Sequence, residues 1–92
     1  MREEKLSCRY DSANSFYGKA KVIYEDDGSL ALKSYSTIVM RIIKGQPIRT
    51  WGGYSATTMR HVNEFMRQNG FGAGNKKMWE EMPVYEEEGG YA

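Results

Sequence analysis

The chain has 92 residues, 40% of them hydrophobic and 13% aromatic, with a formal net charge of +1. This composition indicates a folded protein with one small core, and it argues against a disordered chain and against an enzyme with a second lobe enclosing a deep cleft. One cysteine and one histidine are too few for a disulfide framework or a structural zinc site, so no metal or other cofactor is expected.

No signal in the sequence directs the chain to a membrane. No apolar run approaches the roughly 20 residues of a membrane span, and the charged start MREEK leads into no hydrophobic signal segment. We therefore expect a cytoplasmic protein that has no membrane partner.

Extended segments dominate the first half of the chain. Residues 1–13 show no clear period, so they are expected to be loosely ordered, with a short strand near 6–10. Residues 15–25 alternate as a half-buried strand does, and Asp-Gly at 27–28 then predicts a hairpin.

Three more strands are expected after that hairpin. Residues 30–34 continue the alternation, and residues 38–43 form a β-branched run typical of a central strand. Pro47 suits the start of a short edge strand at 48–51.

The segment 55–69 predicts an amphipathic helix. Ser55 is a suitable N-cap and Gly70 a suitable stop, and Met59, Val62, Phe65 and Met66 recur at helical spacing. The remaining positions are expected to face water or a partner: Arg60, His61, Asn63, Glu64, Arg67 and Gln68.

These elements predict an α+β fold. About four antiparallel strands form a meander, and the amphipathic helix covers one face of the sheet. The expected organisation is a loosely ordered segment at 1–13, a single domain at 14–75, and a short helix with an acidic tail at 76–92. A homodimer through the other sheet face stays open, because Ile23, Val39 and Ile43 are expected there.

Charge is distributed unevenly along the chain. Residues 28–77 carry eight basic residues and one acidic residue, whereas residues 78–92 carry five glutamates and no basic residue. A basic region can attract phosphate or an acidic protein, and an acidic tail can compete for it. Two solvated faces that attract each other are the simpler alternative.

The motif WGGYSATTMRHVNEF, residues 51–65, contains the residue types of a phosphate cradle and of a nucleophilic site. The cradle lacks a P-loop lysine and the dinucleotide spacing. Ser55 and His61 are six residues apart on one helix, so they are expected to point in different directions. We predict no catalytic residue here, a capping role for Ser55 and a surface position for His61.

Two sets of residues are candidates for binding. Aromatic and basic residues on an antiparallel sheet are typical of single-strand nucleic-acid binders, although core and cross-strand packing is the commoner explanation. The candidates for nucleic-acid or anion binding are Lys19, Lys21, Lys33, Arg41, Arg49, Tyr54 and Arg60. The acidic end either covers the chain's own sheet or binds a protein partner, and the candidates for partner binding are Trp79, Glu80, Glu81, Tyr85, Glu86, Glu87 and Glu88.

Three motifs carry a resemblance to known sequences. NSFYGKA at 14–20, LKSYST at 32–37 and GYSATTMRHVNEF at 53–65, followed by QNG at 68–70, resemble a family of small uncharacterised proteins of phages and prophages of Gram-positive gut bacteria. The resemblance covers about residues 14–70, leaves the acidic end outside, and brings no catalytic residues.

This resemblance implies a phage accessory protein, a group in which binding and blocking of host machinery is common. The leading hypothesis is a non-enzymatic inhibitor of a bacterial defence protein, such as an anti-CRISPR protein acting on a CRISPR effector nuclease in the cytoplasm of the infected host. The alternative is a single-stranded nucleic-acid-binding accessory protein that uses the basic, aromatic sheet face.

Overall fold

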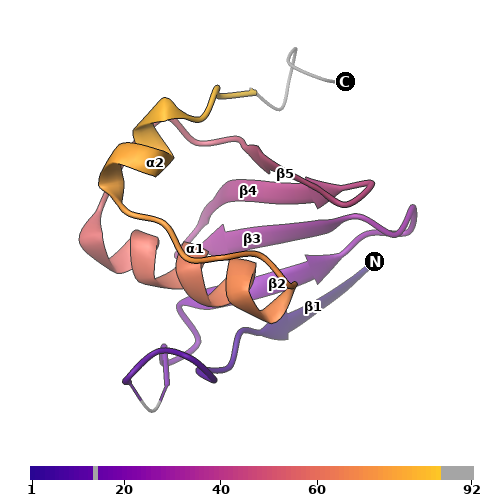
Figure 1. Ribbon diagram of the computed structural model, residues 1–92. Helices are drawn as coiled ribbons and strands as arrows, with labels where there is room; N and C mark the ends of the chain where they lie inside the picture. Colours follow the sequence, from indigo (N-terminus) through magenta and orange to yellow (C-terminus); the bar gives the residue numbers. More distant parts are fainter. Residues whose placement is uncertain (14, 86–92) are drawn as a thin grey trace.

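A computed structural model of the chain describes residues 1–13 and 15–85. It contains one antiparallel sheet of five strands in the order β1-β2-β3-β4-β5, which is a meander (Figure 1). The strands are β1 (Arg2–Lys5), β2 (Ala20–Tyr24), β3 (Leu30–Ser34), β4 (Thr37–Ile43) and β5 (Gln46–Arg49). The expected α+β meander is therefore confirmed, with one strand more than the roughly four that were predicted.

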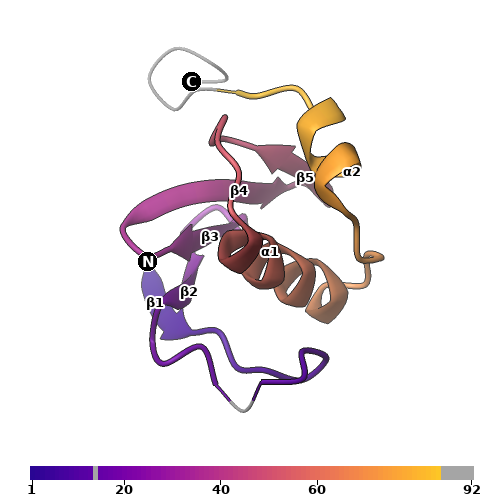
Figure 2. The ribbon, with the colours of Figure 1, turned by 90° about the vertical axis from the view of Figure 1, so that its left-hand side faces the viewer.

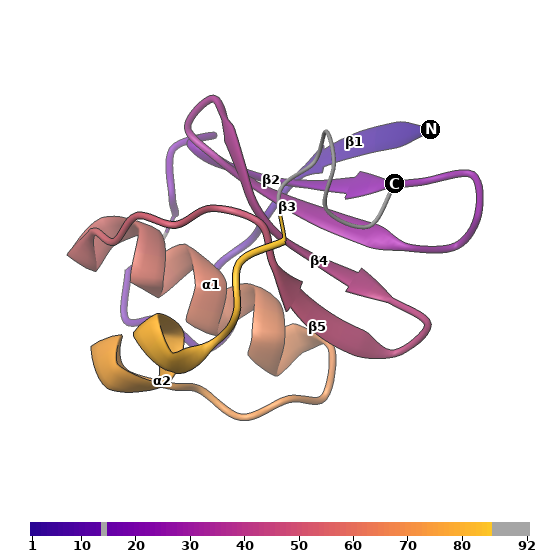
Figure 3. The same cartoon turned by 90° about the horizontal axis from the view of Figure 1, so that it is seen from above.

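The two helices, α1 (Ala56–Gln68) and α2 (Lys76–Glu81), follow the last strand. Figure 2 and Figure 3 show both on the same side of the sheet, with α1 across its middle and α2 close to β5. The other face is covered by no helix of the described chain, and we call it the open face. None of the described helices is long and apolar enough to cross a lipid bilayer.

The additional strand is the N-terminal one. A strand was expected near 6–10, but the structure places it at Arg2–Lys5, paired with β2. All four residues of β1 are exposed and charged, so this edge strand shows no alternation of polar and apolar residues. Backbone pairing with β2 decides its position, and Leu6 then enters the core.

Tight turns shorten or connect the strands. Tyr17 and Gly18 have φ of 55° and 75°, and Lys19 N–H donates to the Phe16 carbonyl at 3.0 Å. This turn starts β2 at Ala20 rather than near residue 15. Asp26 and Asp27 followed by Gly28, at φ 90°, close the predicted β2–β3 hairpin.

The core lies between the sheet and the helices. It includes the predicted helix stripe of Met59, Val62, Phe65 and Met66, together with apolar residues of the strands. Val39 was expected on the open face but is buried, because a bulge shifts the β3–β4 register opposite Leu32 and Lys33. The remaining core residues are Leu6, Phe16, Ala20, Val22, Leu32, Met40, Ile42 and Trp79.

Helix α1 begins and ends as the sequence predicts. Ser55 is the N-cap, with its hydroxyl accepting from Thr58 N–H at 3.0 Å, and Gly70 after the helix has φ of 86°. Two residues expected on its polar face, His61 and Glu64, are instead 1% exposed. The N-terminal segment and the β3–β4 end of the sheet cover this side of the helix, and periodicity within the helix cannot reveal that.

Candidate functional site

Three lysines occupy directly facing positions on three neighbouring strands. Lys5 of β1 is the register partner of Lys21 in β2, and Lys21 is also the partner of Lys33 in β3. Side chains at facing positions of an antiparallel pair lie on the same side of the sheet, about 5 Å apart at Cβ. We call Lys5, Lys21 and Lys33 the lysine row, and it crosses the open face.

The lysine row destabilises the sheet, because like charges at facing positions repel each other. Glu3 relieves part of this repulsion, with its carboxylate 3.4 Å from Lys21 Nζ. This ion pair is well exposed to solvent, so it contributes little to stability. The row therefore leaves a concentrated positive charge on the open face.

Two exposed aromatic residues lie in turns at the end of the sheet where the lysine row lies. Tyr17 precedes β2 by three residues and is 84% exposed, and Tyr35 follows β3 and is 52% exposed. Lys19 contacts Tyr35: its carbonyl accepts from Tyr35 N–H at 2.7 Å, and its Nζ lies 5.8 Å from the Tyr35 ring centre. Four lysines and two exposed tyrosines are therefore gathered at this end, where β1 ends, β2 begins and β3 ends.

Lys19, Lys21 and Lys33 are thus the members of the predicted basic set that the structure brings together. Tyr17 and Tyr35 belong to the aromatic residues that the sequence places among the basic strands, whereas sequence reasoning missed Lys5 as a member of this surface. The facing positions of Lys5 and Lys21 depend on the β1–β2 register, for which the charged β1 sequence gives no signal.

The other predicted anion-binding residues lie elsewhere. The Arg41 guanidinium is 2.9 Å from Glu25, and the Arg60 guanidinium is paired with Asp11. Tyr54 lies just before α1, with Lys76 Nζ 5.2 Å from its ring centre. These residues are not part of the lysine surface.

Arg49 was expected on the binding face, but the structure corrects this prediction. Its register partner is Met40, a core residue, so Arg49 points to the helix side and is 4% exposed. The guanidinium donates to the carbonyls of Trp51 and Trp79 at 2.8 Å each, of Met82 at 3.2 Å and of Gly53 at 3.3 Å. It is a structural clamp on α2 and cannot contact a ligand in this position.

The sequence left two positions open for Trp79, in a pocket of a partner or over its own sheet, and the structure shows the second. It is 1% exposed, its indole N–H donates to the Gly53 carbonyl at 2.8 Å, and Arg49 stacks 4.7 Å from its ring centre. Burial of a large indole within its own chain is more favourable than exposure in a free monomer.

The rest of the predicted acidic surface is exposed or outside the described residues. Glu80, Glu81 and Tyr85 are exposed, and Tyr85 N–H donates to the Arg49 carbonyl at 2.8 Å, beside the edge of β5. Glu86, Glu87 and Glu88 lie outside the described residues.

His61 forms a buried polar cluster with a serine that the sequence did not suggest. Its Nδ1 lies 2.8 Å from the Ser34 hydroxyl, which is 3.0 Å from the Thr58 hydroxyl, and the Phe16 ring packs 4.6 Å away. Burial lowers the pKa of His61 below its ordinary value, and the nearby Arg60 lowers it further, whereas Asp11 opposes the change.

This cluster is sealed, which argues against nucleophilic catalysis. Ser34 and His61 are both buried, and Ser55, the serine considered from the sequence, caps α1 instead. A nucleophile and its base need access to a substrate. The expectation of a surface position for His61 was wrong, because the β3–β4 end of the sheet covers it.

Glu64 attaches the N-terminal segment to α1. Its carboxylate accepts from the backbone N–H of Tyr10 at 2.9 Å, from that of Asp11 at 2.8 Å, and from Gln68 Nε2 at 2.6 Å. Burial raises the pKa of Glu64, but these hydrogen bonds outweigh burial and bring the pKa below its ordinary value.

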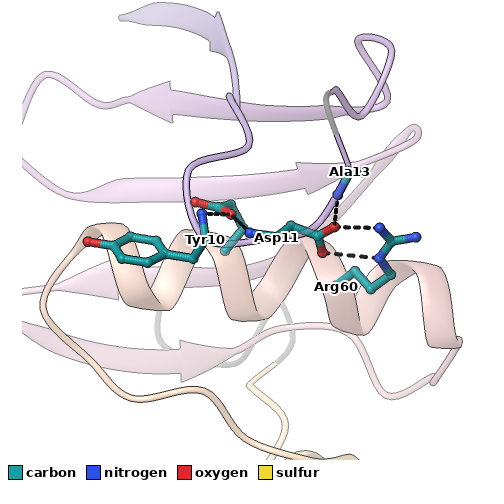
Figure 4. Close-up of polar contacts among 5 residues, drawn as sticks. Tyr10, Asp11, Ala13 and Arg60 are labelled. Carbon is teal, nitrogen blue, oxygen red and sulfur yellow. Dashed lines mark hydrogen bonds and ion pairs between the residues drawn. The ribbon is translucent and has the colours of Figure 1, made fainter.

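A second carboxylate extends this attachment. Figure 4 shows Asp11 between the Ala13 N–H, at 2.9 Å, and the guanidinium of Arg60, whose Nε is 3.0 Å from Asp11 Oδ2. These contacts lower the pKa of Asp11, with the Arg60 hydrogen bond the largest cause.

Among the described residues, no group of three or more metal-ligating side chains is placed to hold a metal ion.

The fold and this surface define a small α+β protein with an open, lysine-bearing sheet face. The chain belongs to a family described as a family of unknown function (DUF8033), whose sequence model matches residues 4–81. The match therefore includes β2 to α2 entirely. No curated protein and no solved structure shows a significant match to the chain.

Proposed function

We propose that this protein is a non-enzymatic binding protein for nucleic acid, and that the lysine row is its phosphate-binding surface. The observation that carries the proposal is the placement of Lys5, Lys21 and Lys33 at directly facing positions on three strands. A phosphate backbone supplies the negative charge that offsets their mutual repulsion, and release of its counterions favours binding.

The proposal is tested by fluorescence anisotropy with labelled oligothymidine and a labelled DNA duplex over a range of salt concentrations. Wild-type affinity should fall steeply as salt rises. In the double variant Lys21→Gln/Lys33→Gln, the slope of log affinity against log salt should decrease by about 1.4 for single strands, or about 0.7 per lost phosphate contact.

The matched control is Lys76→Gln/Lys77→Gln on α2, which removes the same charge at the far side of the molecule. Its slope should stay close to the wild-type value. Absence of wild-type binding, or equal losses in both double variants, would contradict the proposal.

Lys33→Gln should also raise thermal stability slightly, because it removes a like-charge pair worth about 0.2–1 kcal/mol.

A second proposal concerns the acidic end of the molecule. Glu80 and Glu81 are exposed on α2, which Arg49 and Trp79 hold against the β5 edge, away from the lysine row. Two glutamates held in this way can pair with basic residues in a groove of a protein partner. We propose here the function that the phage resemblance implies, which is inhibition of a bacterial defence protein such as a CRISPR effector nuclease.

The two proposals predict different effects of Glu80→Gln/Glu81→Gln. A nucleic-acid-binding protein should bind oligothymidine slightly more tightly, because two negative charges are removed. An inhibitor should lose potency in a nuclease-protection assay, and unchanged potency would contradict the second proposal.

A further inference from the structure

The two exposed tyrosines beside the lysine row occupy backbone positions that bulky residues rarely adopt. Tyr17 has φ of 55° and Tyr35 has φ of 57°, in the left-handed region. Glycine and asparagine take these positions at much lower cost. At both sites, therefore, a tyrosine is less favourable to folding than an asparagine.

The turns explain why these positions need positive φ. Tyr17 is the first central residue of the Phe16–Lys19 turn, and Tyr35 is the first residue of the two-residue loop between the paired Ser34 and Thr37. Tight connections of this kind select glycine, asparagine or aspartate. Strained residues of this type cluster at ligand-binding sites.

Exposure gives both rings access to a ligand. Among the large hydrophobic side chains of the described residues, Tyr17 is the most exposed. The Tyr35 ring packs on one side near His61, at 5.9 Å between ring centres, and stays 52% exposed. A ring supported from behind offers a fixed surface for stacking.

We infer that Tyr17 and Tyr35 stack unpaired bases, so that the surface prefers single-stranded nucleic acid to duplex. This inference rests on the proposed nucleic-acid binding by the lysine row. Tyr17 lies two residues before Lys19, and the Tyr35 ring lies at the end of the sheet with Lys19 Nζ 5.8 Å from its centre, so a strand whose phosphates continue from the lysine row to Lys19 brings its bases to the rings. In a duplex the bases are already stacked and cannot reach the tyrosines.

The test uses the variants Tyr17→Asn, Tyr35→Asn and the corresponding phenylalanine variants of the full chain. Asparagine removes the ring and suits the positive φ, so both asparagine variants should fold and melt at or above the wild-type temperature. Affinity for labelled oligothymidine and oligouridine should fall roughly 5- to 150-fold per tyrosine lost. The salt slope and duplex affinity should not change, and the phenylalanine variants should bind as wild type does.

Each result separates this inference from the proposed function. Lysine-dependent binding with equal affinity for single strands and duplex, or asparagine variants that bind oligothymidine as wild type does, would overturn the stacking role and leave the lysine surface supported. Competition by poly-glutamate as effective as that by oligothymidine would also overturn it, because a polypeptide offers charge without bases. If wild type binds neither nucleic acid, both fail together.

Discussion

At the scale of single residues, buried polar side chains define this protein as much as its apolar core does. His61 and Glu64 lie on α1, and both are hydrogen-bonded: His61 Nδ1 to the Ser34 hydroxyl, and the Glu64 carboxylate to backbone N–H groups of the N-terminal segment. No buried side-chain nitrogen or oxygen of the described residues lacks a hydrogen-bond partner. Removing the hydrogen bonds of His61 or Glu64 therefore lowers the free energy of unfolding more than removing an exposed ion pair does.

The lowered pKa of His61 predicts acid sensitivity. The unfolded chain binds a proton at this histidine near its ordinary pKa of 6.5, whereas the folded chain binds it only at lower pH. The free energy of unfolding should therefore fall as pH decreases below about 6.5, until the folded-state pKa is reached. Urea denaturation at a series of pH values checks this, and His61→Gln should flatten the dependence between pH 6.5 and the range in which the carboxylates titrate.

Replacing Glu64 tests the attachment of the N-terminal segment. Glu64→Gln leaves an amide that cannot accept all three hydrogen bonds, so stability should fall by about 1–3 kcal/mol. Amide hydrogen exchange at Tyr10 and Asp11 should accelerate. Arg60→Gln, which breaks only a partly exposed pair with Asp11, is the control and should cost less than about 1 kcal/mol.

At the scale of elements, α2 is held by one buried cation rather than by its own length. A helix of six residues is unstable alone. Arg49 donates to the carbonyls of Trp79 and Met82 near the C-terminus of α2. Asn63 of α1 forms two hydrogen bonds with Gly74, which lies just before α2. These contacts connect α2 to both the sheet and α1.

We predict that Arg49→Lys releases α2. An ammonium group cannot span carbonyls on three sides as the planar guanidinium does, so stability should fall by at least about 2 kcal/mol. The change is measured by urea denaturation and by hydrogen exchange of α2. Arg67→Lys on the exposed side of α1 is the control, and an equal loss in that variant would contradict the clamp.

At the scale of the whole molecule, the meander separates the lysine row from the exposed glutamates of α2. The lysine row crosses β1, β2 and β3, whereas α2 and residues 82–85 lie by β5. Figure 1 shows this separation, with β1 and α2 at opposite sides of the fold. Trp79 belongs to the core, so a truncation that removes α2 would also unfold the protein.

A usable truncation therefore ends at Tyr85. Removing residues 86–92 deletes three glutamates and raises the formal net charge from +1 to +4. Oligothymidine affinity should increase, most clearly at low salt, because long-range repulsion of phosphate is reduced. Weaker oligothymidine binding by a truncated chain that melts as wild type does would count against nucleic acid as the ligand.

Local patterns predicted much of the fold. The alternation in β2 and β3, the Asp-Gly hairpin, and the apolar stripe and caps of α1 each depend on a few neighbouring residues, so the sequence alone identifies them. The charged strand β1 has no such pattern, because an edge strand exposed to solvent needs no apolar face. The turn at Tyr17 was missed for a related reason: its positive φ is carried by a residue type that rarely adopts it.

For the candidate site, the residue types in the sequence indicated a basic binding surface, but the sequence did not indicate which of those residues lie together. Composition and local patterns establish a small α+β protein with basic strands and an acidic end. The folded arrangement is needed to show that Arg49, Trp79 and His61 are internal and that Lys5, Lys21 and Lys33 form one row. Cross-strand register and the packing of distant segments set these positions, and both depend on contacts between residues far apart in the chain.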